Sequence, residues 1–357
     1  MPVFVRLSGQ LALVYPALLI YGSLFPLTGW RDSGTPPLVF LSAPFPRYWT
    51  VIDLLANVGL YLPLGFFWAL WLLRGPVLKK IWWIAALPAA ALSLGVEVTQ
   101  NWLPARVPSN IDLVCNVLGG VIGVMLARCQ GERWMATLHQ WIGGWIKLDR
   151  SAELGVLLLG LWLVGQWVPD GPAFVSGDWR ALWTSWPPDW APDFSESAGP
   201  TLEAIAVAGH LLAVGMMLRE LMGGSRWQGL ANAALFFLGA ATARALAAAF
   251  MVRTAVAFDW LTVGAQQGLI VGGLLLIPVF FLPDQVRRWL AVLTLLLATL
   301  AVNLAGPNPY GLSALAPDAG GAFSNFFGLT ELVAVIWPLA ALLWWISRMR
   351  RSPIIAG

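Results

Sequence analysis

The chain has few charged residues, and this scarcity excludes most classes of soluble protein. Only 11% of its 357 residues are charged, whereas a soluble globular domain carries about 25%. Its net charge of +3 is too small, and its 21 Lys and Arg residues are too scattered, for a nucleic-acid-binding surface. A soluble enzyme, a fibrous protein and a disordered chain are therefore excluded.

Cysteine is also scarce, which excludes a disulfide-based scaffold. The two cysteines, Cys115 and Cys129, lie 14 positions apart on what we predict to be one helix. Their Cα atoms would then be about 21 Å apart, which is beyond disulfide reach. Neither belongs to a Cys/His cluster with metal-ligand spacing. We expect both to act as small apolar side chains.

Apolar residues are abundant instead, since 59% of the chain is hydrophobic and 22 residues are Trp. A membrane-spanning helix needs about 20 predominantly apolar residues. Ten stretches approach this length, at roughly 9–27, 50–73, 82–104, 110–128, 153–169, 201–221, 228–252, 259–282, 288–305 and 328–347. We therefore predict an all-α fold, a polytopic transmembrane helical bundle of about ten spans, in a bacterial-type cytoplasmic (inner) membrane.

The distribution of Lys and Arg predicts the orientation of this bundle. If the N-terminus is cytoplasmic, 15 of the 21 cations lie in inside connectors, five lie outside, and Arg244 lies within a span. This bias satisfies the positive-inside rule, so both termini are predicted to be cytoplasmic. Arg6 precedes the first apolar run and no A-x-A-like site follows it, which favours a signal anchor over a cleaved signal peptide.

Two connectors suggest the domain organisation. Segment 130–150 spaces its large apolar residues by three or four, which predicts a cytoplasmic interfacial helix carrying Trp134, Leu138, Trp141, Trp145 and Leu148. We expect a four-span domain at 1–128, an interfacial amphipathic helix or linker at 129–152, and a six-span domain at 153–357. Segment 170–200 is expected outside, and its four tryptophans favour aromatic-belt or lid packing over ligand contact: Trp179, Trp183, Trp186 and Trp190.

Polar residues inside the first four spans are the candidate site, because ionisable groups in a membrane are costly and often functional. The pairs Asp53/Asn57, Glu97/Gln100 and Asp112/Asn116 are each spaced to share one helix face. Under the predicted orientation they all fall near the outer ends of their helices. The candidate catalytic residues are Asp53, Glu97 and Asp112, and the candidate ligand-binding residues are Asn57, Gln100, Arg106, Ser109 and Asn116.

We expect these residues to form one cluster in which Arg106 bridges a carboxylate. Three carboxylates against one guanidinium leave about two negative charges to neutralise. Protonation, a divalent cation or a basic ligand group could do so, and no cofactor is evident. A structural network that only fixes helix register stays open. In the second half, buried Arg244 is expected to pair with one of three acids: Glu203, Asp259 or Glu331.

The same residues carry a resemblance to a known family. Tyr21-Gly22-Ser23-Leu24-Phe25-Pro26 ends the first span, and Asp53-x3-Asn57-x5-Pro63-Leu64-Gly65 runs through the second. Glu97-x2-Gln100-x5-Arg106-x2-Ser109-x2-Asp112-x3-Asn116-x2-Gly119-Gly120-x2-Gly123 follows. In this order they resemble the VanZ-like family of membrane proteins over roughly residues 15–127. The resemblance implies a cell-envelope protein, with a founding member linked to teicoplanin resistance, and brings no established reaction.

These observations favour a VanZ-like membrane protein that binds or processes an amphipathic ligand, a lipid or lipid-linked glycan, at the outer leaflet. The three carboxylates would supply acid/base or metal-binding oxygens, and Arg106 would hold a phosphate. A transporter or flippase and a non-catalytic scaffold of an envelope-assembly complex are the alternatives. Membrane lipids are the expected partners and nucleic acid is not. Catalysis, the substrate, a metal, protein partners and the oligomeric state stay open.

Overall fold

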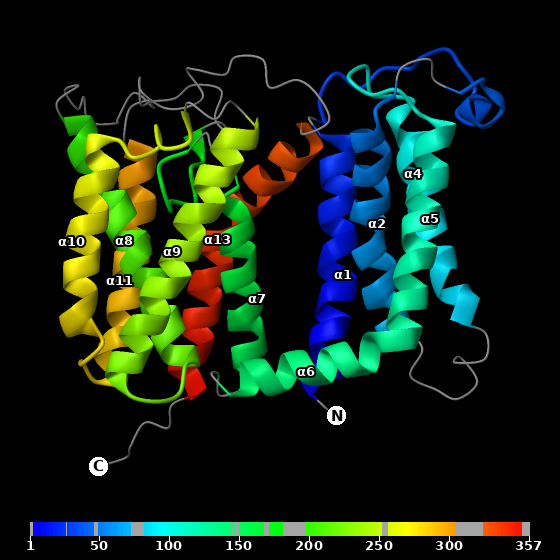
Figure 1. Ribbon diagram of the computed structural model, residues 1–357. Helices are drawn as coiled ribbons and strands as arrows, with labels where there is room; N and C mark the ends of the chain where they lie inside the picture. Colours follow the sequence, from blue (N-terminus) through cyan, green and yellow to red (C-terminus); the bar gives the residue numbers. More distant parts are fainter. Residues whose placement is uncertain are drawn as a thin grey trace. The chain divides into compact units, whose positions relative to one another are not determined.

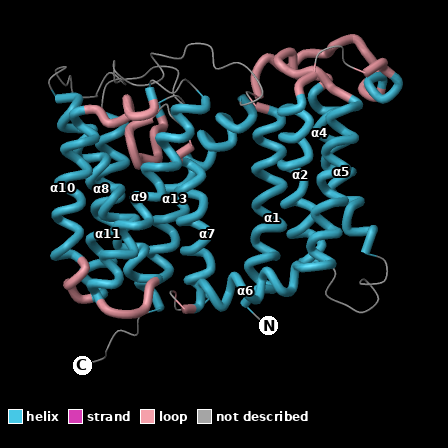
Figure 2. Tube along the Cα trace, in the orientation of Figure 1, coloured by secondary structure: helices cyan, strands magenta, loops and turns pink. Residues whose placement is uncertain are grey.

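The computed structural model is helical throughout the part of the chain that it describes. These residues are 3–25, 27–45, 49–72, 82–144, 146, 150–167, 171–180, 198–251, 256–304 and 324–351. Within them helices are joined by turns and loops, and no strand occurs (Figure 2). The predicted all-α class is therefore confirmed.

The chain divides into two compact units (Figure 1). Unit 1 comprises Met1–Gly144 and Gly320–Leu329, and unit 2 comprises Trp145–Ala319 and Thr330–Gly357. The helices up to Gly143 are α1 (Val3–Leu24), η1 (Val39–Ser42), α2 (Val51–Leu72), η2 (Trp82–Ala86), α4 (Leu87–Gln100), α5 (Asn110–Leu126), the π-helix η3 (Ala127–Gly131) and α6 (Glu132–Gly143). Those that follow are α7 (Arg150–Gly165), α8 (Gly199–Leu221), α9 (Arg226–Met251), α10 (Val263–Val279), α11 (Asp284–Leu304) and α13 (Ser324–Arg351).

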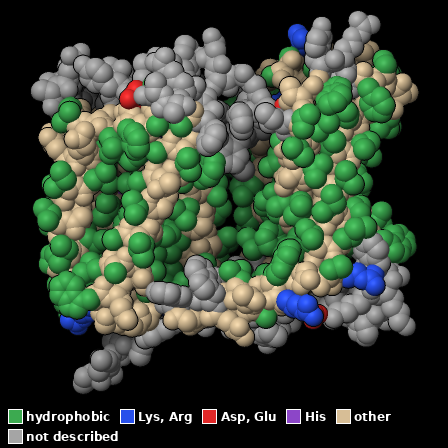
Figure 3. Space-filling view, viewed as in Figure 1, with side chains coloured by type: hydrophobic (Ala, Val, Ile, Leu, Met, Phe, Trp, Pro, Cys, Tyr) green, Lys and Arg blue, Asp and Glu red, His purple; other side chains and the backbone are tan. Residues whose placement is uncertain are grey.

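Each of the ten predicted apolar stretches contains an apolar helix. Among the described residues, seven helices are long and apolar enough to cross a membrane. Three shorter apolar helices, Ser8–Leu24, Ser151–Gly165 and Val263–Val279, occupy the other three stretches. On the face shown in Figure 3 apolar side chains cover the flanks of the helices, as lipid contact requires.

In unit 1, α2 and α5 pack with their backbones in contact because glycine lines the interface. A Cβ atom on Gly65 would lie 2.0 Å from the Gly120 carbonyl oxygen, and one on Gly123 would lie 2.0 Å from that of Leu62. A Cβ atom on Gly119 would lie 2.3 Å from the carbonyl oxygen of Val58. Small residues permit this close approach between membrane helices. The glycine-rich face predicted for 119–123 is thus the α2 contact.

The predicted interfacial segment begins with a change of helix type. α5 passes through the π-helix Ala127–Gly131 into α6, and the chain turns sharply there (Figure 1). π-helical turns are a recognised cause of such kinks. In α6 Met135 is buried while Trp134 and Leu138 are exposed, so one face stays open. The side chain of Trp141, together with Trp145 and Leu148, lies outside the described residues.

Unit 2 is organised around α8, which is buried on nearly all sides. Most of its side chains from Ala206 to Leu218 are inaccessible, as expected of a helix that is apolar all round. Glycine again permits close contact: a Cβ on Gly209 would lie 2.8 Å from the Thr294 carbonyl oxygen of α11. On the α10 side, a Cβ on Gly268 would lie 2.7 Å from the Ala204 carbonyl oxygen.

Residues 171–180 form an irregular segment that enters unit 2, and we call it the inserted segment (Figure 1). Ala173, Phe174 and Ser176 are at most 2% exposed. We had expected the whole connector 170–200 outside. The structure instead packs its first part among the helices, where irregular backbone is tolerated only if protein covers it. The tryptophans at 183, 186 and 190 lie outside the described residues.

Side chains and backbone groups of the surrounding helices form hydrogen bonds with the polar groups of the inserted segment. His210 Nε2 accepts from the Ser176 N–H at 3.3 Å, and Asn303 Nδ2 donates to the Gly177 carbonyl at 2.6 Å. Asn303 Oδ1 accepts from the Trp179 N–H at 2.8 Å, and the Trp179 indole donates to the Val335 carbonyl at 2.9 Å. Trp179 therefore packs within unit 2.

Gly177 is required at its position in this segment. Its φ of +84° favours glycine, and a Cβ there would lie only 2.7 Å from Pro338 of α13.

A charged cluster joins the ends of α8, α11 and α13 in unit 2. Glu220, whose side chain is 5% exposed, pairs with Arg288 at 2.9 Å and with Arg348 at 3.0 Å. The end of α8, the start of α11 and the end of α13 therefore lie together. The positive-inside prediction assigned all these connectors to one side, which is consistent with this grouping. Which side faces the cytoplasm stays a prediction.

Candidate functional site

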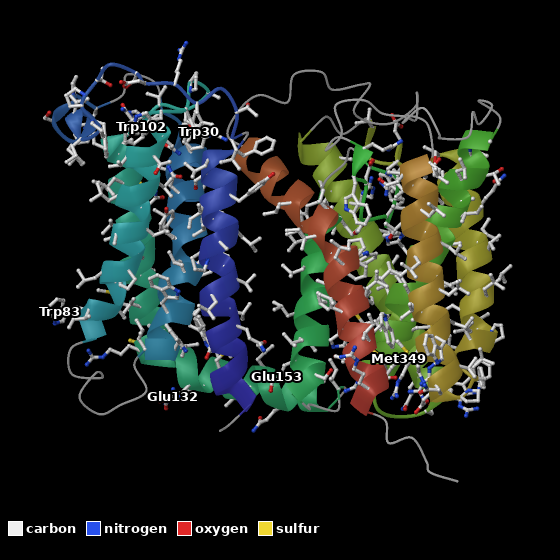
Figure 4. The ribbon with its side chains drawn as sticks, turned by 180° about the vertical axis from the view of Figure 1, so that it is seen from behind. Trp30, Trp83, Trp102, Glu132, Glu153 and Met349 are labelled. Carbon is white, nitrogen blue, oxygen red and sulfur yellow. The ribbon has the colours of Figure 1, made fainter. Side chains whose placement is uncertain are left out.

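Four helix ends meet at one end of unit 1 and carry the predicted site residues. The first turns of α2 and α5 lie together there, since Asn57 of α2 bonds to Asp112 of α5. The last turns of α1 and α4 also lie together, since Gln100 Nε2 of α4 donates to the Ser23 carbonyl of α1. Figure 4 labels Trp30 and Trp102 at this end. The alternation of helix direction therefore brings residues from distant parts of the sequence together.

A hydrogen-bonded network joins three of these helices, and we call it the carboxylate network: Asn57, Glu97, Ser109 and Asp112. The Ser109 N–H donates to Glu97 Oε2 at 2.8 Å. Ser109 Oγ accepts from the Asp112 N–H at 3.4 Å, which makes Ser109 the N-cap of α5. Asn57 Nδ2 then donates to Asp112 Oδ1 at 2.8 Å. Glu97 is 3% exposed, so its end of the network is buried.

Asp53 lies beside this network and has a different partner. Its Oδ2 accepts from the N–H of Thr50 at 3.1 Å and from its hydroxyl at 2.7 Å, while Thr50 Oγ1 accepts from the Asp53 N–H. This reciprocal arrangement is a capping box at the start of α2. Asp112 interacts electrostatically with both Asp53 and Glu97, so the three predicted carboxylates do gather at this end.

The expected bridge from Arg106 to a carboxylate is wrong. The Arg106 Nε and Nη2 atoms donate to the Phe25 carbonyl at 2.8 and 2.5 Å, and within the described chain Arg106 forms no ion pair. Phe25 directly follows α1, whose last carbonyls have no partner within the helix, so a cation is favourable there. Burial of this half-buried guanidinium lowers the pKa of Arg106 below its usual value. Gln100 binds the same helix end.

Asn116 lies one turn below Asp112 and extends the polar region inward. Its Nδ2 donates to Ser93 Oγ of α4 at 3.0 Å, and Ser93 is fully buried. The sequence analysis missed Ser93 and its neighbour Tyr61. The signal was present, because Ser93 lies four residues before Glu97 and Tyr61 four residues after Asn57, each on the same helix face.

The loop at 27–45 covers this end of unit 1. The Arg31 N–H donates to the Trp102 carbonyl at 3.0 Å, Thr35 bonds to Asn101, and Asn110 Nδ2 donates to the Ala43 carbonyl at 2.7 Å. The loop thus holds the turn that contains Arg106 and Ser109. The outer surface of its second part is apolar, with several large side chains 46–69% exposed: Leu38, Val39, Leu41 and Phe45. Its first part instead exposes polar residues: Arg31, Asp32, Ser33 and Thr35.

A metal centre built from carboxylates and imidazoles is not seen in the described parts of the chain. No group of three or more His, Cys, Asp or Glu side chains there is placed to hold a metal ion. Both cysteines are free.

Unit 2 holds a second group of buried polar residues near the inserted segment. Arg244 is 2% exposed, donates to the Gly171 carbonyl and lies 5.9 Å above the Trp260 ring. Glu203 interacts electrostatically with Arg244 and accepts a hydrogen bond from Thr262 at 2.7 Å. The buried Arg244 is thus partnered, and Glu203 is the candidate acid that lies near it. Glu331 has no described side chain.

These features define a helical membrane protein whose N-terminal helices hold a buried polar network near their ends. Residues 12–131, about a third of the chain, match the family model described as VanZ/LLP1, so the chain carries a VanZ/LLP1 domain there. The rest of the chain is not covered by a family. Neither a curated protein nor a solved structure is significantly similar to the chain.

Proposed function

We propose that this protein acts in the cytoplasmic membrane and binds or processes a lipid or lipid-linked glycan at the outer leaflet. The binding site is the end of unit 1 that carries the carboxylate network. One observation carries the proposal: a buried polar network lies beneath a loop whose second part, 38–45, exposes large apolar side chains. An amphipathic ligand matches this pairing, because its head group needs polar partners while its chains stay in lipid.

Each network residue has a role in this proposal. Glu97 and Asp112 supply acceptor oxygens for hydroxyl or amino groups of the head group, and they are the acid/base candidates if a reaction occurs. Asn57 and Ser109 hold Asp112 and Glu97 in place through the bonds described above. Arg106 keeps its Nη1 donors beyond its bonds to Phe25, and these can reach a phosphate. A role in resistance to glycopeptide-type antibiotics belongs to the same proposal.

The test is retention of lipid by purified full-length protein. The protein is extracted from bacterial membranes, and bound lipids are measured by native mass spectrometry. Asp112→Asn should reduce retained lipid by about tenfold, because the variant loses the carboxylate that faces the ligand. Asp259→Asn is the matched control, since Asp259 lies in unit 2 at an exposed position. The control should retain lipid like the wild type.

The same experiment separates binding from the scaffold alternative. If the network is only structural, Asp112→Asn should lower folded yield, because Asn57 and the N-terminus of α5 lose a charged partner, while retained lipid per folded molecule stays unchanged. Equal lipid retention by folded Asp112→Asn and wild type therefore refutes the proposed site.

Transport is a second candidate function, and the inserted segment favours it. Irregular backbone within a helical membrane domain is typical of transporter binding sites, where unwound segments meet buried polar side chains. Here the segment meets His210, Asn303 and Arg244. Proteoliposomes with a fluorescent lipid in one leaflet test this function. Wild-type exchange faster than in empty liposomes, with a lower rate per folded molecule in Asn303→Leu, would support transport, and wild-type exchange no faster than in empty liposomes would reject it.

A further inference from the structure

A second polar layer lies one helical turn below the carboxylate network. Tyr61 follows Asn57 by four residues, Asn116 follows Asp112 by four, and Ser93 precedes Glu97 by four on the antiparallel α4. Each residue therefore shares a helix face with its network neighbour and lies deeper in unit 1. We call Tyr61, Ser93 and Asn116 the inner layer.

The inner layer is sealed from solvent and incompletely hydrogen-bonded. Ser93, Tyr61 and Asn116 are 0%, 2% and 4% exposed. Asn116 Nδ2 donates to Ser93 Oγ at 3.0 Å, but Asn116 Oδ1 has no partner among the described residues. The Tyr61 hydroxyl lies near Ser93 and interacts electrostatically with Glu97, but it completes no hydrogen bond of normal geometry to a described residue. Two such groups in one layer require an explanation, because buried polar atoms are normally paired.

The chemistry of this layer is that of an acceptor site. Asn116 Oδ1, Ser93 Oγ and the Tyr61 hydroxyl are neutral oxygens, and the buried Glu97 carboxylate lies one turn above them. Arg106 does not neutralise this charge, because it donates to Phe25. Hard monovalent cations prefer oxygen ligands, and an ammonium group carries three donors and no acceptor.

The next turn closes the site from below. A Cβ on Gly120 would lie 2.8 Å from Ala89 Cβ, and one on Gly65 would lie 2.0 Å from the Gly120 carbonyl oxygen. The helices are in contact at this depth, so the inner layer is the deepest polar layer beneath the carboxylate network. A group bound there must be small.

We propose that the inner layer is a subsite for a small monovalent cation, either a sodium ion or the primary ammonium group of the ligand. The subsite adds a cation-binding part to the proposed lipid site. It rests on the proposed function for the identity of the rest of the ligand. Binding of a small cation can nevertheless be measured without the amphipathic ligand, so the two proposals can fail separately.

The experiment measures the thermal unfolding midpoint of full-length protein in nanodiscs. NaCl, ethanolamine hydrochloride and choline chloride are titrated at matched ionic strength. Sodium or ethanolamine should raise the midpoint in a saturable way above choline, which is larger and has no N–H donor. The salt that does so identifies the source of the cation. Tyr61→Phe should weaken this response by about tenfold in apparent affinity.

Tyr15→Phe is the matched control, because its hydroxyl donates to the Leu60 carbonyl at 2.8 Å and is not part of the inner layer. It should keep the wild-type response. Tyr61→Phe removes a hydroxyl that completes no hydrogen bond of normal geometry within the described residues, so folding should be preserved, and Ser93→Ala provides a second variant. Equal midpoints in all three salts, or an unchanged response in both variants, overturns the subsite. A cation response without lipid retention overturns the proposed function and leaves the subsite intact.

Discussion

Asn57 links α2 to α5 through its bond to Asp112, and this contact gives the first prediction. Asn57→Leu leaves a partly buried carboxylate without one of its donors. The free energy of unfolding should fall by about 1–3 kcal/mol. Unfolding in detergent micelles, followed by circular dichroism, measures it. Asn101→Leu is the control, because Asn101 bonds to Thr35 at an exposed position, and it should change stability by less than about 0.5 kcal/mol. Equal losses in both variants would contradict the role of Asn57.

At the scale of the residue, the sequence predicted which side chains share a helix face better than it predicted their bonding partners. The i, i+4 spacing predicted that Asp112 and Asn116 share one face of a helix, and both lie on α5 with side chains bonded to neighbouring helices. Arg106 was assigned to a carboxylate because opposite charges attract. In the structure Arg106 donates to the Phe25 carbonyl, because the end of α1 has carbonyl groups without partners in the helix. The sequence around Arg106 does not show that these carbonyls lie nearby. Asp53 and Asn57 share a helix face, but this spacing did not predict that they have different partners. Asp53 caps α2, whereas Asn57 binds α5.

The backbone contact between α2 and α5 supplies a prediction at the scale of the element. Gly65→Ala places a Cβ atom 2.0 Å from the Gly120 carbonyl oxygen, so the helices must separate. Stability should fall by at least about 1–3 kcal/mol. Gly59→Ala on the same helix is the control, since no atom lies within 4 Å of its Cβ position, and it should be neutral or stabilising. Fluorescence-detected gel filtration after heating compares them. Equal melting of the two variants would refute the tight contact.

The inserted segment provides a second prediction at this scale. Asn303→Leu leaves the Gly177 carbonyl and the Trp179 N–H without their partner. Each unpaired buried group costs about 1–3 kcal/mol, so folded yield should drop sharply. Gln285→Leu, at an exposed position of the same helix, should leave the yield unchanged. Limited proteolysis should cut within 171–180 in the first variant alone. Identical digestion patterns would show that Asn303 does not hold the segment.

The inserted segment also shows where prediction from sequence ends at this scale. Apolar stretches of membrane-spanning length located the ten apolar helices found among the described residues, because a helix that crosses lipid needs about 20 apolar residues. It could not show that a Pro- and Trp-rich connector enters the protein, since the groups that satisfy its backbone are far away in the chain. Trp179 donates to a carbonyl 156 residues further on. Such contacts depend on the assembled bundle.

Orientation is the prediction that belongs to the whole molecule. In a variant in which Ala replaces Cys115 and Cys129, single cysteines replace Val107 or Asp284, both of which are well exposed, at 82% and 71%. The positive-inside assignment predicts that a membrane-impermeant maleimide labels residue 107 in intact cells and residue 284 only after permeabilisation. The reverse pattern would invert the orientation and move the carboxylate network to the cytoplasmic leaflet.

The way the inserted segment is held has a consequence for biosynthesis. Its partners His210, Asn303 and Ala334 are all synthesised after the segment itself, and the last lies on α13. When residues 171–180 leave the ribosome, these hydrogen-bond partners have not yet been made, and backbone without partners cannot stay in lipid. The segment must therefore wait at the membrane surface until the later helices have been inserted. The inserted segment therefore reaches its final position only after helices that follow it in the chain. A nascent chain that stops before α13 leaves an incomplete bundle, which membrane quality control can recognise.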